Sequence, residues 1–264
     1  MRLRLLRHAT LLIEYAGQRL LLDPMFAAAL SQNPVGNAAN ADRWPRGPLP
    51  IDEAELRRTC AALSGVLVTH THRDHWDPQA IELVPKSLPL LCQPEDAAAI
   101  TKAGFTALSP LAASATWLGI EVARTGGRHG SGPLADRLGP VSGFVLRHAD
   151  EPTLYVAGDT VWCDEVQSAL AMHQPDVVVL NAGAAQFLTG GVITMDVPDL
   201  LQVAAAAPDA ALVAVHFETV NHCLLTRAAC REGLAAASLS RRVKVPNDGE
   251  TLAWTASDAP SRRR

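Results

Sequence analysis

Three histidines and two aspartates fall within eight residues of this sequence, in the segment His70–Asp77 of VLVTHTHRDHWDPQ, although the whole chain has only nine histidines. Neutral imidazole and carboxylate groups are the ligands that zinc, manganese and iron take in proteins. Four of these groups lie within six residues: His70, His72, Asp74 and His75. Because that is more than one ion needs from one loop, the segment predicts a site for two metal ions. The alternative is a polar turn with solvated histidines, and for Asp77 we expect a helix cap instead of a ligand.

Further ligands for two ions are expected after other predicted strands. GGRHGSGP places His129 among glycines, where the backbone can approach an ion closely. Asp159 follows the apolar run in LYVAGDTVW, and a carboxylate there is costly to bury unless it is paired or bound to metal. His216 ends the apolar run in LVAVHFETVNH. Taken alone, a histidine or aspartate at a strand end is more often a cap or a hydrogen-bonded surface residue, but the occurrence of these three together favours a shared site.

The elements that position these residues alternate between strands and helices. Most of the first 23 residues are typical of strands, with a turn at Gly17-Gln18. The patterns predict a helix at 52–62, a strand at 65–69, and a helix that starts at Asp77-Pro78. Apolar runs predict later buried strands at 120–123, 143–147, 153–157, 176–180 and 211–215, and helical patterns lie at 163–171, 196–207 and 224–237. This order predicts an α/β fold with sheet covered by helices.

Residues 31–50 should form a long loop, because SQNPVGNAANADRWPRGPLP contains four prolines, two glycines and three asparagines. Structureless loops of this length in compact domains are usually functional or disordered. We expect a flap over the metal edge or a contact between subunits of a homo-oligomer.

The composition limits the class of protein. The formal charge of −4 is not that of a nucleic-acid-binding protein, and 48% hydrophobic residues are sufficient for a large core. No apolar run reaches the length of about 18 residues that a membrane span needs, and the N-terminus lacks the apolar segment of a signal peptide. The five cysteines are odd in number and scattered, which predicts free thiols and a cytoplasmic protein. We expect residues 1–264 to form one domain.

The ordered set His70-x-His72-x-Asp74-His75, His129, Asp159 in a GDT triplet, and His216 resembles the metal motifs of the metallo-β-lactamase superfamily. The likeness extends over nearly the whole chain. RHATLLIEYAGQRLLLDPMF, with DHWDP and AGDTVW, is similar to the branch that contains L-ascorbate-6-phosphate lactonase and N-acyl phosphatidylethanolamine phospholipase D.

The resemblance implies an αββα sandwich of two mixed sheets with the site along one edge. One ion would be held by three residues: His70, His72 and His129. The second would be held by Asp74, His75 and His216, with Asp159 bridging the two. Two divalent ions are implied, with zinc expected and manganese or iron as alternatives. The implied activity is hydrolysis of a small ester, lactone or related bond by a metal-bridging hydroxide, with Asp74 and Asp159 in the catalytic centre.

Residues around the expected ions are candidates for contacts with substrate or for the outer shell. His8 stands where the branch has a histidine, and Asn181 and His222 are candidates for binding a substrate oxygen. Glu218 either holds an imidazole N–H or faces water, and Arg128 either pairs an anionic substrate or is simply exposed.

Three other functions are compatible with parts of the pattern. A phosphodiesterase acting on a small or lipid phosphodiester is the main alternative, with a nuclease disfavoured by the acidic charge. A di-iron oxidoreductase would need a flavin domain for which 264 residues leave no room. A non-catalytic binding protein is disfavoured by the complete set of ligands.

Overall fold

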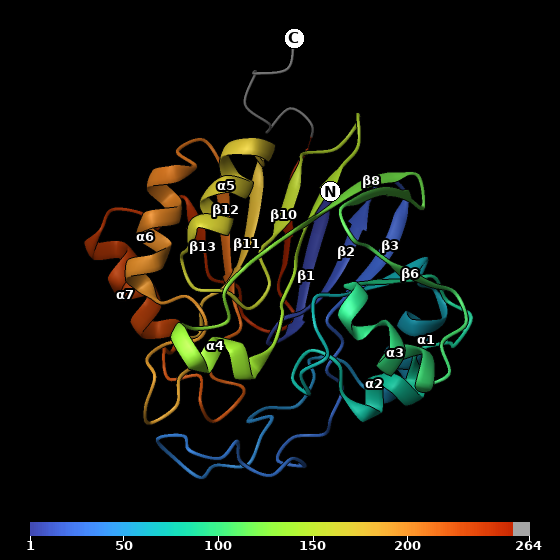
Figure 1. Cartoon of the computed structure of the whole chain (residues 1–264), viewed down its shortest axis with the longest axis horizontal. Coiled ribbons are helices and arrows are strands. Elements are labelled where there is room, and N and C mark those ends of the chain that lie inside the picture. Colours follow the sequence, from blue (N-terminus) through green and yellow to red (C-terminus); the bar gives the residue numbers. More distant parts are fainter. Residues whose placement is uncertain (256–264) are drawn as a thin grey trace.

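The computed structural model describes residues 1–255. Two seven-stranded sheets pack against each other, and helices cover their outer faces. Figure 1 shows α1, α2 and α3 beside one sheet and α5, α6 and α7 beside the other. The expected α/β sandwich of two mixed sheets flanked by helices is therefore confirmed.

The first sheet has the strand order β14-β1-β2-β3-β4-β5-β6. The strands are β1 (Arg2–Arg7), β2 (Thr10–Tyr15), β3 (Gln18–Leu22), β4 (Gly65–Val68), β5 (Leu90–Cys92), β6 (Leu108–Pro110) and β14 (Thr251–Ala253). Antiparallel pairing joins β14, β1, β2 and β3, whereas β3, β4, β5 and β6 are parallel. The turn after Tyr15 is the tight hairpin that Gly17-Gln18 predicted, and Gly17 has φ +72°.

The second sheet has the order β13-β12-β11-β10-β9-β8-β7. The strands are β7 (Ser114–Trp117), β8 (Ile120–Thr125), β9 (Gly143–Arg147), β10 (Leu154–Val156), β11 (Val177–Asn181), β12 (Ala211–Val215) and β13 (Val243–Lys244). Its strands β10 to β13 are parallel, and β7 to β10 are antiparallel. Each sheet therefore has a parallel half. Its inner strands β4, β5, β10, β11 and β12 are mostly apolar because both of their faces are buried.

The helices are α1 (Glu53–Ala61), α2 (Pro78–Leu83), α3 (Ala97–Lys102), α4 (Gly132–Leu138), α5 (Asp164–His173), α6 (Val197–Ala206) and α7 (Arg227–Ala236), with a 3-10 helix η1 (Pro94–Asp96). The apolar layer between the sheets includes Leu22, Phe144 and Val179, all at most 2% exposed. Each such side chain contributes about 1.5–3 kcal/mol when it is fully buried.

Most elements expected from the sequence are present within two residues of their predicted ends. Asp77 caps α2 as predicted, because its side chain accepts a hydrogen bond from the Ala80 N–H and Pro78 is the first helical residue. The short elements β5, β6, β7, β13, β14, α3 and α4 were not predicted. No helix within residues 1–255 is long and apolar enough to cross a membrane.

Candidate metal centre

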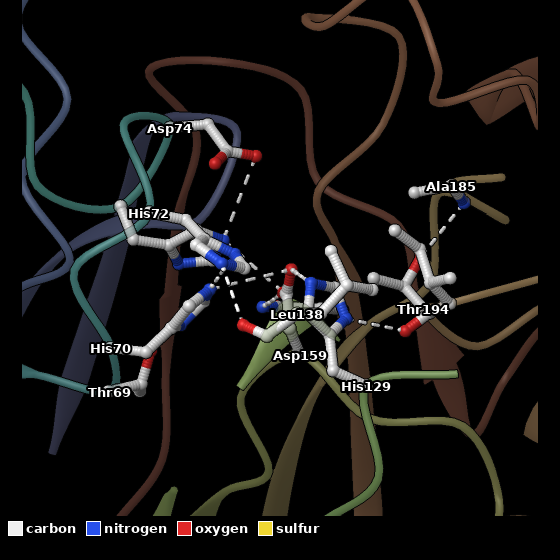
Figure 2. A network of polar contacts seen from close by, with 12 residues as sticks. Thr69, His70, His72, Asp74, His129, Leu138, Asp159, Ala185 and Thr194 are labelled. Atoms are coloured by element: carbon white, nitrogen blue, oxygen red, sulfur yellow. Dashed lines mark hydrogen bonds and ion pairs between the residues drawn. The ribbon is translucent and has the colours of Figure 1, made fainter. Parts of the chain in front are cut away.

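The residues singled out for metal chemistry follow the carboxyl ends of strands from both sheets. His8 follows β1, the segment beginning at His70 follows β4, Asp159 follows β10, and His216 follows β12. Buried, apolar strands thus present polar side chains at a common edge, as is usual for ligand sites in α/β sheets. Figure 2 shows His70, His72, Asp74, His129 and Asp159 pointing toward one another.

A first group of donors is formed by His70, His72 and His129, and one ring nitrogen from each lies within 4.8 Å of the other two. His70 Nε2 is 3.0 Å from His72 Nδ1. The sequence brings the first two together through the i, i+2 spacing, and His129 joins them from the other sheet. Within this group burial lowers the pKa of His70 well below its ordinary value, and burial also lowers the pKa of His129. The lowered pKa values favour the neutral form of His70 and His129, which is the form that binds a metal.

A second group is formed by Asp74, His75 and His216. The Nε2 atoms of His75 and His216 are 3.3 Å apart, and His216 Nε2 is 3.6 Å from Asp74 Oδ2. Both rings are fully buried, whereas the Asp74 side chain keeps 14% of its surface exposed. Asp74 is therefore the carboxylate of this group that solvent can reach.

Asp159 lies between the two groups and offers one oxygen to each. Its Oδ1 is 3.3 Å from His75 Nε2 and 3.4 Å from His216 Nε2. Its Oδ2 is 3.6 Å from His129 Nε2 and 3.9 Å from His70 Nε2. Gly158 makes this position accessible: its φ is +71°, and a Cβ there would lie 2.5 Å from the Ser142 carbonyl oxygen.

Charge in the second group is balanced by histidines. Burial opposes a charged imidazole at His216, yet the nearby Asp159 carboxylate raises its pKa to about 10. Burial opposes the charge on His75 as well, but Asp159, Asp74 and Asp23 raise its pKa well above the ordinary value. Within residues 1–255, the ion-pair contacts of Asp74 and Asp159 are all with histidines. Buried carboxylates balanced only by imidazoles are a donor set that suits a bound cation.

The outward nitrogen of each ring is held by another group, which directs the inward nitrogen at the centre. His72 Nε2 donates to the Leu138 carbonyl oxygen at 3.1 Å, and His129 Nδ1 donates to the Ile193 carbonyl oxygen at 2.8 Å. His75 Nδ1 donates to Asp23 Oδ2 at 2.8 Å. Such partners fix the tautomer and orientation of a ligating histidine.

Asp23 and Thr69 form a node that sequence reasoning missed. Asp23 accepts from the Thr69 backbone N–H at 2.8 Å and from the Thr69 hydroxyl at 2.7 Å. Because that hydroxyl donates to Asp23, it accepts from His70 Nδ1, 3.0 Å away. Asp23 therefore orients His75 directly and His70 through Thr69. The only local signal was an acidic residue at the end of an apolar strand, in LLLDP, the same signal that singled out Asp159.

His8 belongs to the outer part of the centre. Its Nε2 is 3.2 Å from Asp74 Oδ2, and its ring lies against the His216 ring with centroids 3.6 Å apart. Burial lowers its pKa to about 3, so the ring is neutral. Its carbonyl oxygen accepts the His216 N–H at 2.9 Å. His8 thus touches both Asp74 and His216.

The remaining substrate candidates, Asn181 and His222, have different environments in the structure. The Asn181 amide donates to Asp159 Oδ1 at 2.6 Å, so it holds that carboxylate. His222 is 7% exposed, its Nδ1 is buried without a hydrogen-bond partner within the described chain, and burial lowers its pKa to about 4. Its ring stacks on Phe187 at a centroid distance of 5.9 Å. Of the two, His222 keeps a polar atom that is not engaged by the protein.

Two other residues are engaged away from the histidines. Glu218 accepts from the Arg227 backbone N–H and pairs with its guanidinium, so the suggestion that it holds an imidazole is wrong. Arg128 is about half exposed and pairs with Glu165 and Asp164 on α5, which leaves the exposed interpretation in place.

Three residues at this edge have a left-handed backbone conformation. His8 has φ +61°, Asp23 has φ +44° and His216 has φ +73°, although none is glycine. This conformation costs an ordinary residue roughly 1–2 kcal/mol. Non-glycine residues held this way are concentrated at functional sites, where surrounding structure over-determines them.

The loop 31–50 is joined to the site by the fully buried Asn221. The Asn221 side chain accepts from the Val35 N–H at 2.8 Å and donates to the carbonyl oxygens of Val35 and Asn40 at 3.1 and 3.0 Å. Arg73, inside the histidine segment, donates to the Gln32 side chain at 2.6 Å. An apolar cluster lies under this loop: Met25, Trp44, Leu134, Ala185, Ile193, Val220 and Cys223.

Comparisons with known proteins agree with this architecture. Residues 18–217 match a family described as the beta-lactamase superfamily domain. The chain is 34% identical to the UPF0173 protein YddR of Bacillus subtilis (strain 168) over 251 residues, which cover 94% of this chain and 98% of that protein.

Two solved structures superpose over nearly the full length. An isothiocyanate hydrolase from Delia radicum gut bacteria has 38% identity and a TM-score of 0.91, with 97% of this chain and 100% of that chain covered. A protein from Veillonella parvula DSM 2008, described as a possible metal-dependent hydrolase, has 34% identity and a TM-score of 0.92, with 96% and 99% covered.

Proposed function

Because the chain belongs to the metallo-β-lactamase superfamily and is a metal-dependent hydrolase, we propose that it holds two divalent ions and hydrolyses a small, uncharged compound at an electrophilic carbon. The observation that supports two ions is the position of Asp159, with one oxygen at 3.3 Å from His75 in one donor group and the other at 3.6 Å from His129 in the other.

The first ion is assigned to His70 Nε2, His72 Nδ1 and His129 Nε2. The second is assigned to Asp74, His75 Nε2 and His216 Nε2. Asp159 serves both. Zinc is the expected metal, and manganese and iron are the alternatives that the same donors accept.

When bound, two such ions lower the pKa of a water and polarise the bond under attack. The side chains of the protein orient the groups that bind the metal and accept or hold protons. Asp74 and Asp159 are ionised, because the surrounding histidines lower both pKa values well below the ordinary value against the effect of burial. We assign Asp74 to accept the proton of the attacking water, since its carboxylate is partly exposed to solvent. Asn181 and His8 keep the two carboxylates in place through their contacts at 2.6 and 3.2 Å.

The preference for an uncharged substrate is supported by the surroundings of the donors. Leu138 and Ile193, which bind His72 and His129 through their carbonyl oxygens, pack in the apolar cluster under loop 31–50. Two arginines near this edge have protein partners, because Arg73 contacts Gln32 and Arg128 pairs with Glu165. Two divalent ions can themselves hold a phosphodiester, so a phosphodiester remains the second candidate class of substrate.

Esters, lactones and isothiocyanates share the required electrophilic carbon. The resemblance to the lactonase of that branch supports a lactone, whereas the phospholipase D of the same branch, which cleaves a phosphodiester, supports the phosphodiesterase alternative. The isothiocyanate hydrolase that shares 38% identity with this chain supports the third. For an isothiocyanate, one water adds to the central carbon and the C–N bond breaks, so that R–N=C=S and H₂O give R–NH₂ and COS. His222 is the proposed contact for the leaving oxygen or nitrogen, since its Nδ1 is buried without a partner in the described chain.

A substrate panel tests this proposal. Protein containing two ions per chain by elemental analysis is assayed with an aryl ester, a γ-lactone, an aralkyl isothiocyanate and a bis-aryl phosphodiester. Turnover of one of the three carbon electrophiles, lost on chelation and restored by zinc or manganese, is expected. Turnover of the phosphodiester alone would favour the phosphodiesterase alternative, and activity that survives complete removal of metal would contradict the proposal.

A further inference from the structure

The outward nitrogen of His216 meets sulfur instead of oxygen. His216 Nδ1 lies 3.6 Å from Cys223 Sγ, whereas the other four rings meet a hydroxyl, two carbonyls and a carboxylate. Cys223 is 1% exposed and is a free thiol. The Cys223 sulfur is therefore buried beside the His216 ring, which faces the metal centre.

The backbone fixes this contact. Cys223 forms an isolated β-bridge with Ala185, and the adjacent Gly183 packs directly on the pair. A Cβ on Gly183 would lie 2.0 Å from the His216 carbonyl oxygen and 3.3 Å from Cys223 Cβ. Only glycine fits there, so His216 and Cys223 are held in one position by the segment that follows β11.

Sulfur holds this ring more weakly than oxygen would. Because His216 Nε2 is directed at Asp74 and Asp159, a metal-binding tautomer carries its proton on Nδ1, facing Cys223. Thiol sulfur is a weak acceptor, whereas His75 donates to the Asp23 carboxylate, a strong one. A stronger outward acceptor makes a histidine a more basic ligand.

We propose that Cys223 is the positioning residue of His216, and that its weak acceptance makes the second ion, assigned to Asp74, His75 and His216, the more readily exchanged of the two. This inference rests on the proposed two-ion centre. The competing explanation is that Cys223 only fills space, since a buried free cysteine commonly behaves as a small apolar residue.

The variants Cys223→Ala and Cys223→Ser separate the two explanations, with Cys230→Ala as the matched control. Cys230 is also fully buried, but it lies on α7 and packs toward the second sheet, in a different cluster from Cys223. Ions per chain are measured by elemental analysis after equilibration with graded chelator concentrations. Cobalt-loaded protein gives an absorption spectrum for each ion, and thermal melting and circular dichroism report folding.

Wild type should lose one ion at a lower chelator concentration than the other. Cys223→Ala should weaken that ion alone, by about 10–100-fold, and change its cobalt spectrum. Cys223→Ser replaces the weak sulfur acceptor with a hydroxyl oxygen and should hold the second ion at least as tightly as wild type does. Cys230→Ala should match wild type in both ions.

Three results would overturn the inference. Cys223→Ala that keeps both ions with wild-type affinity means that the thiol only packs. Equal loss of both ions in Cys223→Ala means that the residue does not act through His216. Wild type that never binds a second ion refutes the two-ion centre itself, and the inference fails with it.

Discussion

His216 and His222 lie six residues apart but occupy different environments. His216 has a left-handed backbone and directs Nε2 at His75, Asp74 and Asp159. His222 instead stacks on Phe187 and keeps a buried, unengaged Nδ1 within the described chain. Replacement of His216 and replacement of His222 should therefore have different effects on metal content and on activity.

We expect His216→Ala to lose roughly one ion per chain, because it removes a donor of the second group. His222→Ala should keep both ions and lower kcat or raise KM. Elemental analysis and steady-state kinetics check both, with His148→Ala, at a partly exposed surface position paired with Asp150, as the control. The reverse pattern would exchange the two assignments.

Binding of the second ion should release protons. The Asp159 carboxylate raises the pKa of His216 to about 10, so this ring is protonated at pH 8 before metal binds, and the pKa of His75 is raised well above its ordinary value. His70 and His129 have lowered pKa values and are already neutral. A proton bound below the raised pKa competes with the metal, so the apparent affinity for the second ion should rise from pH 8 to 10.

Calorimetry of metal binding at pH 8, in buffers of different ionisation enthalpy, measures this release. We expect more proton release for the second ion than for the first, because His216 must lose its proton to bind a metal. His216→Ala should remove about one proton of that release. Equal release by both ions would contradict this distribution of charge.

The sequence could predict the donors but not the residues that orient them. His70 to His75, His129, Asp159 and His216 carry local signals, because each is a ligand-type residue at the end of an apolar run. Asp23 carries the same signal, yet its role depends on β3 lying beside β4, which places it against Thr69 and His75. That adjacency is a property of the sheet order, and no local pattern encodes it.

Asp23→Ala tests the importance of this node. It leaves the Thr69 N–H, the Thr69 hydroxyl and His75 Nδ1 without their acceptor, and each unsatisfied buried group costs about 1–3 kcal/mol. Denaturant unfolding of the metal-free chain should show this loss of stability, and metal affinity should fall by about 10–100-fold. Unchanged metal affinity would mean that Asp23 serves the fold alone.

Among the elements, the loop 31–50 shows that the sequence predicts irregular structure but does not predict which residues anchor it. Its irregular structure was evident from its prolines and glycines, and only a single bridge, Gln32 with Trp44, interrupts it within the described chain. Its attachment was not evident, because the partner residue Asn221 lies about 180 residues away and offers no motif. Short strands such as β13 and β14 were missed for a similar reason, since pairing with a neighbour stabilises them more than their own sequence does.

Asn221→Ala should increase the mobility of this loop without removing a metal ligand. The change breaks three hydrogen bonds to Val35 and Asn40, so the loop should be cleaved faster by protease and KM should rise. Both ions should remain, and the melting temperature should fall by a few degrees, at about 2–4 °C per kcal/mol. Unchanged kinetics with faster cleavage would mean that the loop is only a tether.

At the scale of the molecule, each proposed ion joins the two sheets. His70, His72, Asp74 and His75 come from the sheet that contains β4, whereas His129, Asp159 and His216 come from the sheet that contains β8, β10 and β12. Neither sheet carries a complete set for either ion. Metal binding should therefore stabilise the packing of one sheet against the other.

Removal of metal should lower the melting temperature for this reason. An ion at 100 times its Kd stabilises the native state by about 2.7 kcal/mol, so the two ions together should raise the transition by several degrees. Differential scanning calorimetry with and without chelator measures the shift. A transition unaffected by metal would contradict bridging of the sheets by the ions.

The division of the metal donors between the two sheets also determines when, during synthesis of the chain, each metal site becomes complete. Synthesis runs from the N-terminus, so His70 leaves the ribosome long before His129 and His216, and a half-made chain can offer only part of either ion's ligands. The first sheet carries four of the donors but the complete set for neither ion, so both sites are completed only after His129, Asp159 and His216 have been translated. We therefore expect both ions to bind late in synthesis. By then most of the chain has been made, and the geometry of the site can discriminate between metals.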